Sequence, residues 1–205
     1  MTSALAQGPY GFKPLRHLTG GLIRPNSAGI YSIASGYGTN LFAGDLVATS
    51  GAAQSVAGIT SKNIVAAAVG TAKARGVFMG CEFVDSVGNV RFEKAYTQIA
   101  PLANTLIKAF VYDDPFIVFK AQATTGFANT MTSAFFKQST ATAGSALTGM
   151  SGQAVDASTH SGSATNLNLF VIGLTEIPGN DFGGFAEVEV MISAHELNPF
   201  TATGA

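Results

Sequence analysis

Few residues of this chain have the types and spacings that catalysis needs. The three histidines, His17, His160 and His195, lie far apart in the sequence, and no G-x-S-x-G motif presents a serine nucleophile. The single cysteine, Cys81, lies in the apolar run 77–83, which is typical of a small core residue rather than a reactive thiol. The sequence therefore predicts no nucleophilic site.

The paired carboxylates also have simpler explanations than acid–base catalysis. Asp113 and Asp114 precede Pro115, and this combination is typical of a turn. Glu187 and Glu189 would share one strand face at a separation of about 6–7 Å, near the range found in glycoside hydrolases. The chain has no tryptophan to stack on a sugar, so a solvated strand face is the favoured interpretation. We predict no catalytic residue and no enzyme activity.

Metal, phosphate and nucleic-acid sites lack their usual patterns. His195 and Glu196 stand without further ligands nearby in the sequence, and Gly36 and Gly38 lack the third glycine of a dinucleotide-binding loop. Only three basic residues precede the first acidic one, so no strong basic patch indicates nucleic acid. We expect no metal, no cofactor and no nucleic-acid partner.

Charge is scarce along the whole chain. Among 205 residues, 11 are basic and 12 are acidic, while 47% are hydrophobic. An ordinary soluble domain is about one-quarter charged. No apolar run reaches the length of a membrane span, and the N-terminus lacks the layout of a signal peptide. A surface this poor in charge favours a component of an assembly that neighbours cover.

The few charges are also unevenly placed. Residues 1–44 carry three basic residues and no acidic one, whereas residues 138–205 carry six acidic residues and no basic one. Such asymmetry is consistent with head-to-tail contact between copies or with docking on a charged partner. Pairing of the two ends within one chain explains it equally well.

Most of the chain has the pattern of β-strands. Residues 30–33 and 41–48 form short strand-like runs, the second interrupted by Gly44 as a β-bulge candidate. Three pairs of strands are expected on either side of turns; they are 76–84 with 90–94, 107–112 with 116–121, and 167–177 with 185–194. In the last strand, Val188, Val190 and Ile192 alternate with polar positions, which predicts a half-buried antiparallel strand.

The predicted architecture is an all-β, antiparallel β-sandwich or barrel, jelly-roll-like or β-tulip-like. Residues 1–28 are dense in glycine and proline and are expected to form an extended N-terminal arm before a β-rich domain at 29–205. A sub-boundary is placed near 95–105. Residues 121–166, rich in Ala, Thr, Ser and Gly, are interpreted as an elaborated insertion.

Several motifs together resemble a family of head decoration, or cement, proteins of tailed bacteriophages. Residues 8–16 resemble the family's G-F-x-P-x-R start, 41–47 its L-F-x-G-D-x-V strand and 76–81 its G-V-F-x-G-x strand. The turn at 111–115 and the strand at 169–174 are also similar. The resemblance covers most of the chain in order but has no counterpart for residues 121–166.

The resemblance implies a non-enzymatic virion protein on the capsid exterior, made in the bacterial host cytoplasm. It implies that the protein bridges adjacent major capsid protein subunits and forms homo-oligomers, with a trimer favoured over a dimer. Alternative interpretations are the major shell protein itself, or a jelly-roll carbohydrate- or receptor-binding module of the virion. The residues that we predict to contact the capsid or a partner are Tyr10, Phe12, Arg16 and Arg24 in the arm and Phe127, Phe135 and Phe136 as a second apolar anchor.

Overall fold

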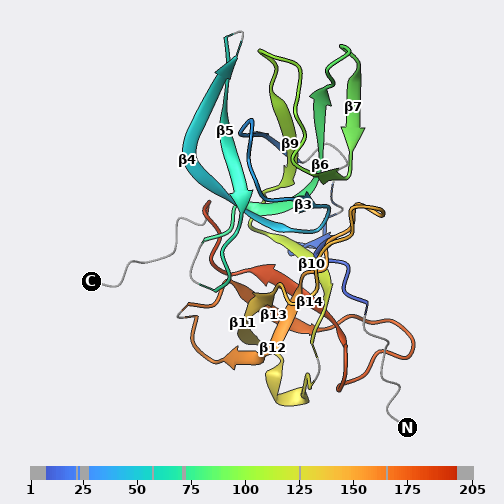
Figure 1. Cartoon of the computed structure of the whole chain (residues 1–205). Coiled ribbons are helices and arrows are strands. Elements are labelled where there is room, and N and C mark those ends of the chain that lie inside the picture. Colours follow the sequence, from blue (N-terminus) through green and yellow to red (C-terminus); the bar gives the residue numbers. More distant parts are fainter. Residues whose placement is uncertain are drawn as a thin grey trace.

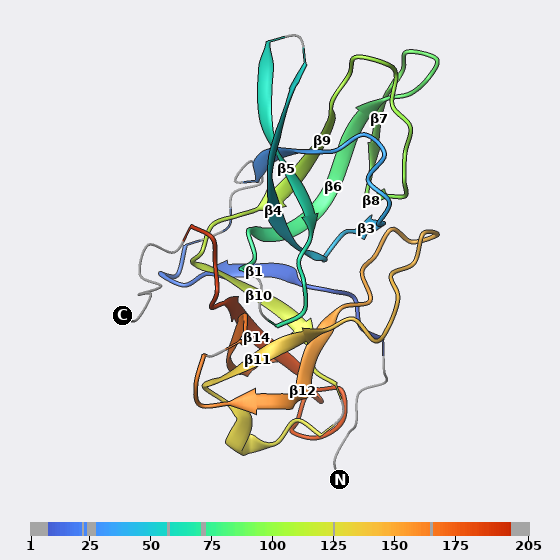
Figure 2. The ribbon, with the colours of Figure 1, turned by 60° about the vertical axis from the view of Figure 1, so that its left-hand side comes forward.

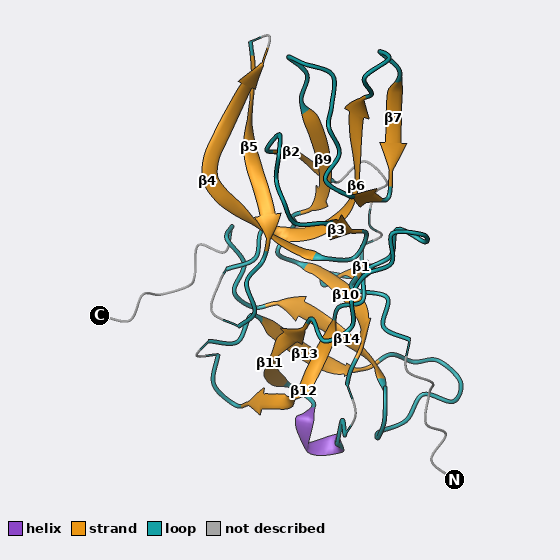
Figure 3. Ribbon diagram, viewed as in Figure 1, coloured by secondary structure: helices purple, strands orange, loops and turns teal. Residues whose placement is uncertain are grey.

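Strands and loops make up almost the whole molecule. The computed structural model describes residues 8–21, 23, 28–56, 58–70, 73–124, 126–164 and 166–197. Within these residues the chain forms fourteen strands and one short 3-10 turn, η1 (Asn129–Met131). Figure 3 shows the strands in orange and this turn in purple. The predicted all-β, mainly antiparallel and sandwich-like architecture is confirmed.

One six-stranded sheet contains strands from both ends of the chain, and we call it the terminal sheet. Its strand order is β1-β10-β14-β13-β11-β12, and every pairing is antiparallel. Its strands are β1 (Lys13–His17), β10 (Ile117–Gln122), β11 (Ala134–Ser139), β12 (Ala154–Ser161), β13 (Leu169–Leu174) and β14 (Glu187–Ile192). In β14, Val188, Val190 and Ile192 are buried, as their alternation predicted.

The other six-stranded sheet, which we call the barrel sheet, has the order β4-β5-β2-β9-β6-β7. Its strands are β2 (Gly29–Ile33), β4 (Leu46–Val56), β5 (Ile59–Ala66), β6 (Gly76–Val84), β7 (Val90–Glu93) and β9 (Ile107–Tyr112). An additional β4–β6 pairing closes the first five strands of this order into a ring, and β7 lies outside the ring on the edge of β6. The short strands β3 (Leu41–Phe42) and β8 (Ala95–Tyr96) pair separately.

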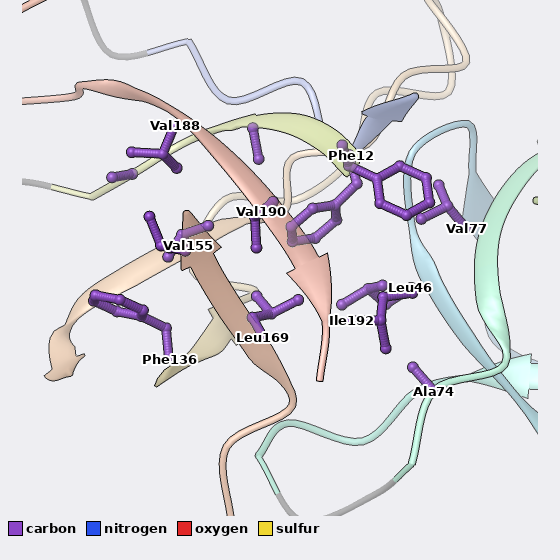
Figure 4. Close-up of a cluster of buried hydrophobic side chains, with 14 of the residues drawn as sticks. Phe12, Leu46, Ala74, Val77, Phe136, Val155, Leu169, Val188, Val190 and Ile192 are labelled. Atoms are coloured by element: carbon purple, nitrogen blue, oxygen red, sulfur yellow. The ribbon is translucent and has the colours of Figure 1, made fainter. Parts of the chain in front are cut away.

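The two sheets share one hydrophobic core. Figures 1 and 2 show the barrel sheet standing above the terminal sheet. The larger cluster of buried residues combines Leu46 and Val77 of the barrel sheet with Leu169 and Val190 of the terminal sheet, as Figure 4 shows. A second cluster, which includes Phe78 and Tyr96, fills the interior of the barrel sheet. The shared cluster packs one sheet against the other.

The strand expected over residues 41–48 is interrupted at Gly44. This residue has a φ of +101°, and a Cβ at this position would lie 3.0 Å from the carbonyl oxygen of Tyr10. Glycine therefore lets the N-terminal segment pass close to the end of β3. The Phe12 N–H donates a hydrogen bond of 2.9 Å to the Gly44 carbonyl oxygen, so the interruption holds the N-terminal segment in place.

Where the structure describes it, the expected extended N-terminal arm pairs with the β-rich domain. β1 forms the edge of the terminal sheet and pairs with β10, with Lys13 opposite Lys120 and His17 opposite Ile117. The Gly8 N–H also donates to the Gln122 side-chain oxygen at 3.0 Å. Glycine and proline stop regular structure before and after β1, but the five residues between them are long enough to pair with a sheet edge.

Two expected connections are also corrected. Residues 113–115 do not form a hairpin turn, because β9 lies in the barrel sheet and β10 in the terminal sheet. The chain crosses between the sheets here, and not near residues 95–105, where β8 belongs to the barrel half. Residues 121–166 are not an insertion, because they supply β11 and β12 of the terminal sheet. The hairpins β6–β7 and β13–β14 are confirmed.

Candidate assembly surface

Three of the predicted contact residues belong to the core. Phe12 is 1% exposed, and Phe127 and Phe136 are fully buried in the cluster that joins the two sheets. Phe127 and Phe136 contact each other with ring centroids 5.9 Å apart. Their assignment as anchors for a partner is wrong in this fold, because their apolar surface is already covered by the chain itself.

The remaining predicted contacts are partly exposed or fall outside the described residues. The Phe135 ring lies 5.0 Å from the Phe170 ring across the β11–β13 pair. The Tyr10 ring lies 4.2 Å from the Lys13 ammonium, and burial together with the neighbouring Glu187 carboxylate raises the pKa of its hydroxyl. Arg24 lies outside the described residues.

The basic N-terminal segment pairs with acidic residues of the same chain. Arg16 and Glu189 form an ion pair of 2.7 Å between β1 and β14, across the intervening strand β10. Lys120 and Glu187 form a second ion pair of 2.8 Å on the same sheet. Of the basic residues in segment 1–44, Arg16 therefore pairs with the acidic C-terminal part of the same chain.

Cys81 and His160, two of the residues considered for catalysis, lie in different sheets. Cys81 is 1% exposed, and burial, with a contribution from Glu93, raises the pKa of its thiol to about 12. His160 lies on β12 against Phe136, far in the fold from the Cys81 thiol inside the barrel sheet. In the described part of the chain, no group of three or more His, Cys, Asp or Glu side chains could hold a metal ion.

A polar cluster at the junction of the two sheets was not predicted from the sequence. We call it the junction cluster, and it consists of Tyr31, Arg75, Asp113, His195 and Glu196. The Arg75 Nε donates to the Tyr31 hydroxyl at 2.5 Å, and this hydroxyl donates to Asp113 Oδ2 at 2.5 Å. Arg75 also lies 3.8 Å from Asp113 and 4.0 Å from Glu196. Its members come from four separate segments, so their sequence spacing carried no indication of this contact.

The geometry of the junction cluster favours a structural role. Arg75 and Glu196 have side chains that are 17% and 16% exposed, and the Thr49 N–H and hydroxyl donate to the Glu196 carboxylate at 2.8 and 2.9 Å. Burial and the hydrogen bond to Asp113 raise the pKa of Tyr31 to about 12. The cluster ties strands β2 and β4 to the crossing at residues 113–116 and to the segment that follows β14.

His195 makes the stability of this junction dependent on pH. It is fully buried, and its Nδ1 accepts a 3.0 Å hydrogen bond from the Leu197 N–H, so the neutral ring carries its proton on Nε2. Burial and the positive charge of Arg75 lower the pKa of His195, against opposing contributions from Asp113, Glu196 and Asp114. The folded protein therefore binds a proton less readily than the unfolded chain, whose histidine pKa is about 6.5.

We expect the free energy of unfolding to fall as the pH is lowered from about 6.5, with a slope of at most about 1.4 kcal/mol per pH unit from this group. Urea unfolding midpoints measured across this range, for the wild type and for His195→Gln, test the assignment. The variant should lose part of the dependence on pH. An unchanged slope in His195→Gln, or titration of the His195 ring at its ordinary pKa in an NMR experiment, would contradict it.

Three hairpin and loop tips gather at one end of the barrel sheet, which we call the hairpin end. They are the β4–β5 tip (residues 54–60, of which 57 is not described), the β6–β7 turn (85–89) and the loop before β9 (99–105). Figures 1 and 2 both show them projecting away from the terminal sheet. The Leu102 N–H donates to the Val84 carbonyl oxygen at 2.9 Å, which fixes the third tip beside β6.

The hairpin end is apolar and nearly uncharged. Ile59 is 59% exposed, Val87 82% and Leu102 38%, while Asp85 is the only charged residue in the three segments. The backbone N–H of Asn89 and the Arg91 side chain lower the pKa of Asp85 to about 2. A hollow of about 290 Å³ lies between the β4–β5 hairpin and residues 101–105. A surface of this kind is suited to close contact with another protein.

Comparison with protein-family models, with curated protein sequences and with solved structures finds no match to this chain. The family resemblance expected from the sequence motifs therefore stays an expectation. None of the helices in the described segments is long and apolar enough to cross a membrane. The functional interpretation depends on the geometry of the hairpin end.

Proposed function

We propose that this chain is a non-enzymatic structural protein of a virion. It decorates and cements the outside of a bacteriophage capsid by bridging adjacent major capsid protein subunits. One observation carries the proposal: the hairpin end exposes Ile59, Val87 and Leu102 on three separate tips that carry almost no charge. The motifs that resemble phage decoration proteins support the same class.

The apolar tips have a physical reason to find a partner. Removing apolar surface from water contributes about 25 cal/mol for each Å² that is buried. Val87 and Ile59 are mostly exposed and gain only part of this free energy in the isolated chain. The hydrogen bond from the Leu102 N–H to the Val84 carbonyl oxygen holds one of the tips in place, which reduces the entropy lost when that tip binds. The hairpin end would lie across a boundary between capsid subunits.

The proposal also agrees with the positions of the tyrosines. A carbohydrate-binding module would stack sugars on exposed aromatic rings. Tyr31 and Tyr96 are instead buried, and Tyr37 stacks on Tyr96 with ring centroids 6.1 Å apart. We therefore propose no second function for this chain.

We expect the double substitution Ile59→Lys with Val87→Lys to weaken binding to capsids on the order of tenfold or more. Each buried side chain of this size contributes about 1.5–3 kcal/mol, and 1.4 kcal/mol changes affinity tenfold. The measurement is co-sedimentation of the purified protein with capsids that lack it. Ile30→Lys is the matched control, because Ile30 is 62% exposed on β2, outside the hairpin end. Wild-type occupancy by the double variant would contradict the assignment of this surface.

A further inference from the structure

Strand β7 is an open edge of the barrel sheet. It pairs with β6 on one side, and the strand order ends with it. All four of its residues are exposed; Val90 is 56% exposed and Phe92 is 70% exposed. In Figure 1, β7 lies at the outer side of the upper half of the molecule. Unpaired strand edges with exposed apolar side chains readily pair with another strand.

Other edges that the structure describes are protected over part of their length. β1 carries Pro14, which has no N–H to donate to a further strand. The base of β4 pairs with β6 at Leu46 and Val47, β5 pairs with β2 at Asn63, and the start of β12 is bridged through Val155 to Ala123. β7 has no such protection along its four residues.

The backbone of β7 directs alternate residues outward. The Asp85 N–H donates to the Asn89 carbonyl oxygen at 2.9 Å, which makes these residues a hydrogen-bonded pair of the β6–β7 ladder. Hydrogen-bonded and non-hydrogen-bonded pairs alternate along an antiparallel ladder. Val90 and Phe92 therefore direct their N–H and C=O groups away from β6, toward the open side.

We propose that β7 pairs with β7 of a second copy of this chain, antiparallel about a two-fold axis that passes beside Phe92. The outward-directed N–H and C=O groups of Phe92 are consistent with this position of the axis, because they can form a hydrogen-bonded pair with Phe92 of the second copy. In the same register Arg91 lies opposite Glu93 of the second copy, and Glu93 lies opposite its Arg91.

The charges of β7 fit this pairing. Arg91 of one copy and Glu93 of the other form a non-hydrogen-bonded pair across the axis. In such pairs the Cα atoms lie about 4.5 Å apart and the side chains are closest. Opposite charges directly across a strand pair are stabilising, and the two-fold axis produces this contact twice. Arg91 donates its Nε to Asp85 at 3.0 Å, and no hydrogen bond from its Nη groups to another described residue is found. The Phe92 side chains of the two copies contact each other on the opposite face of the paired strands.

The contact is small, so we expect a weak homodimer that forms at high micromolar concentration. Neighbouring copies held on a shared surface would pair more strongly, because their effective concentration is higher. The pairing of β7 does not depend on the proposed virion function, and the isolated full-length chain is sufficient to test it.

The test exchanges the charges of β7 and measures dimerisation by sedimentation equilibrium. Glu93→Arg places like charges opposite each other in both contacts, as does Arg91→Glu, and each variant alone should dimerise on the order of tenfold more weakly. An equimolar mixture restores both opposite-charge pairs and should form heterodimers. Recovery in the mixture also shows that neither variant failed to fold.

A cysteine placed at the axis gives an independent readout. Hydrogen-bonded antiparallel pairs have Cα atoms about 5.5 Å apart, which a disulfide can bridge. Phe92→Cys should form covalent dimers under mild oxidation, whereas Val87→Cys, which is more exposed but off the axis, should not. Cys81 is buried and does not compete. The proposal would be overturned if the chain stays monomeric at high micromolar concentration. It would also be overturned if neither charge variant changes the affinity of dimerisation.

Discussion

Replacing Phe12 with alanine is expected to lower the free energy of unfolding by about 3–5 kcal/mol. Phe12 is 1% exposed and lies in the cluster that joins the two sheets, beside Val77 in Figure 4. It also lines a groove of about 310 Å³, so the truncation would join an existing hollow instead of a space that neighbours can fill. The loss therefore belongs near the upper part of this range.

The measurement is urea unfolding followed by circular dichroism, with Phe116→Ala as the matched control. Phe116 is 51% exposed, so the same truncation there should cost about 1 kcal/mol or less. A Phe12→Ala protein with wild-type stability and weakened capsid binding would restore Phe12 as a contact residue. We expect instead that Phe12→Ala lowers the free energy of unfolding, and that any weaker capsid binding results from this loss of stability.

The hairpins could be predicted from the sequence because their information is local. Asp85 and Asn89 mark the β6–β7 turn, and the alternation of Val188, Val190 and Ile192 marks a half-buried strand. The crossing at 113–116 could not be recognised in this way. Asp113 and Asp114 have turn chemistry in either case. The pairing of β10 with β1 and β14, which are distant in the sequence, places the chain in the terminal sheet.

The candidate surface was harder to predict for a related reason. An aromatic residue in a glycine-rich segment is equally consistent with a partner contact and with a distant core. Phe12 and Phe127 belong to the core because β1 and residues 121–166 are strands and loops of the terminal sheet. The exposure of Val87 and Phe92 follows from a closed ring that leaves its tips and one edge outside. That ring depends on pairings between segments far apart in the sequence.

Replacing Arg75 with methionine is expected to lower the free energy of unfolding by about 2–4 kcal/mol, because it leaves two mostly buried carboxylates without their cation. Asp113 and Glu196 have side chains 21% and 16% exposed, and the Tyr31 hydroxyl would lose its donor from Arg75. The methionine keeps most of the volume of the arginine stem, so the loss reports charge and hydrogen bonding more than packing.

Arg91→Met is the matched control for this change in the junction cluster. It removes the same charge from a pair with Asp85 whose arginine is 59% exposed, and we expect a loss below about 0.5 kcal/mol. Adding Asp113→Asn to Arg75→Met should restore part of the stability, because it removes one of the unpaired carboxylates while Tyr31 can still donate to the amide oxygen. Equal losses in Arg75→Met and Arg91→Met, measured from urea unfolding midpoints, would show that the junction cluster does not hold the two sheets together. A larger loss at Arg75 with partial recovery in the double variant would show that it does, since the two arginines differ mainly in burial and in the number of chain segments they join.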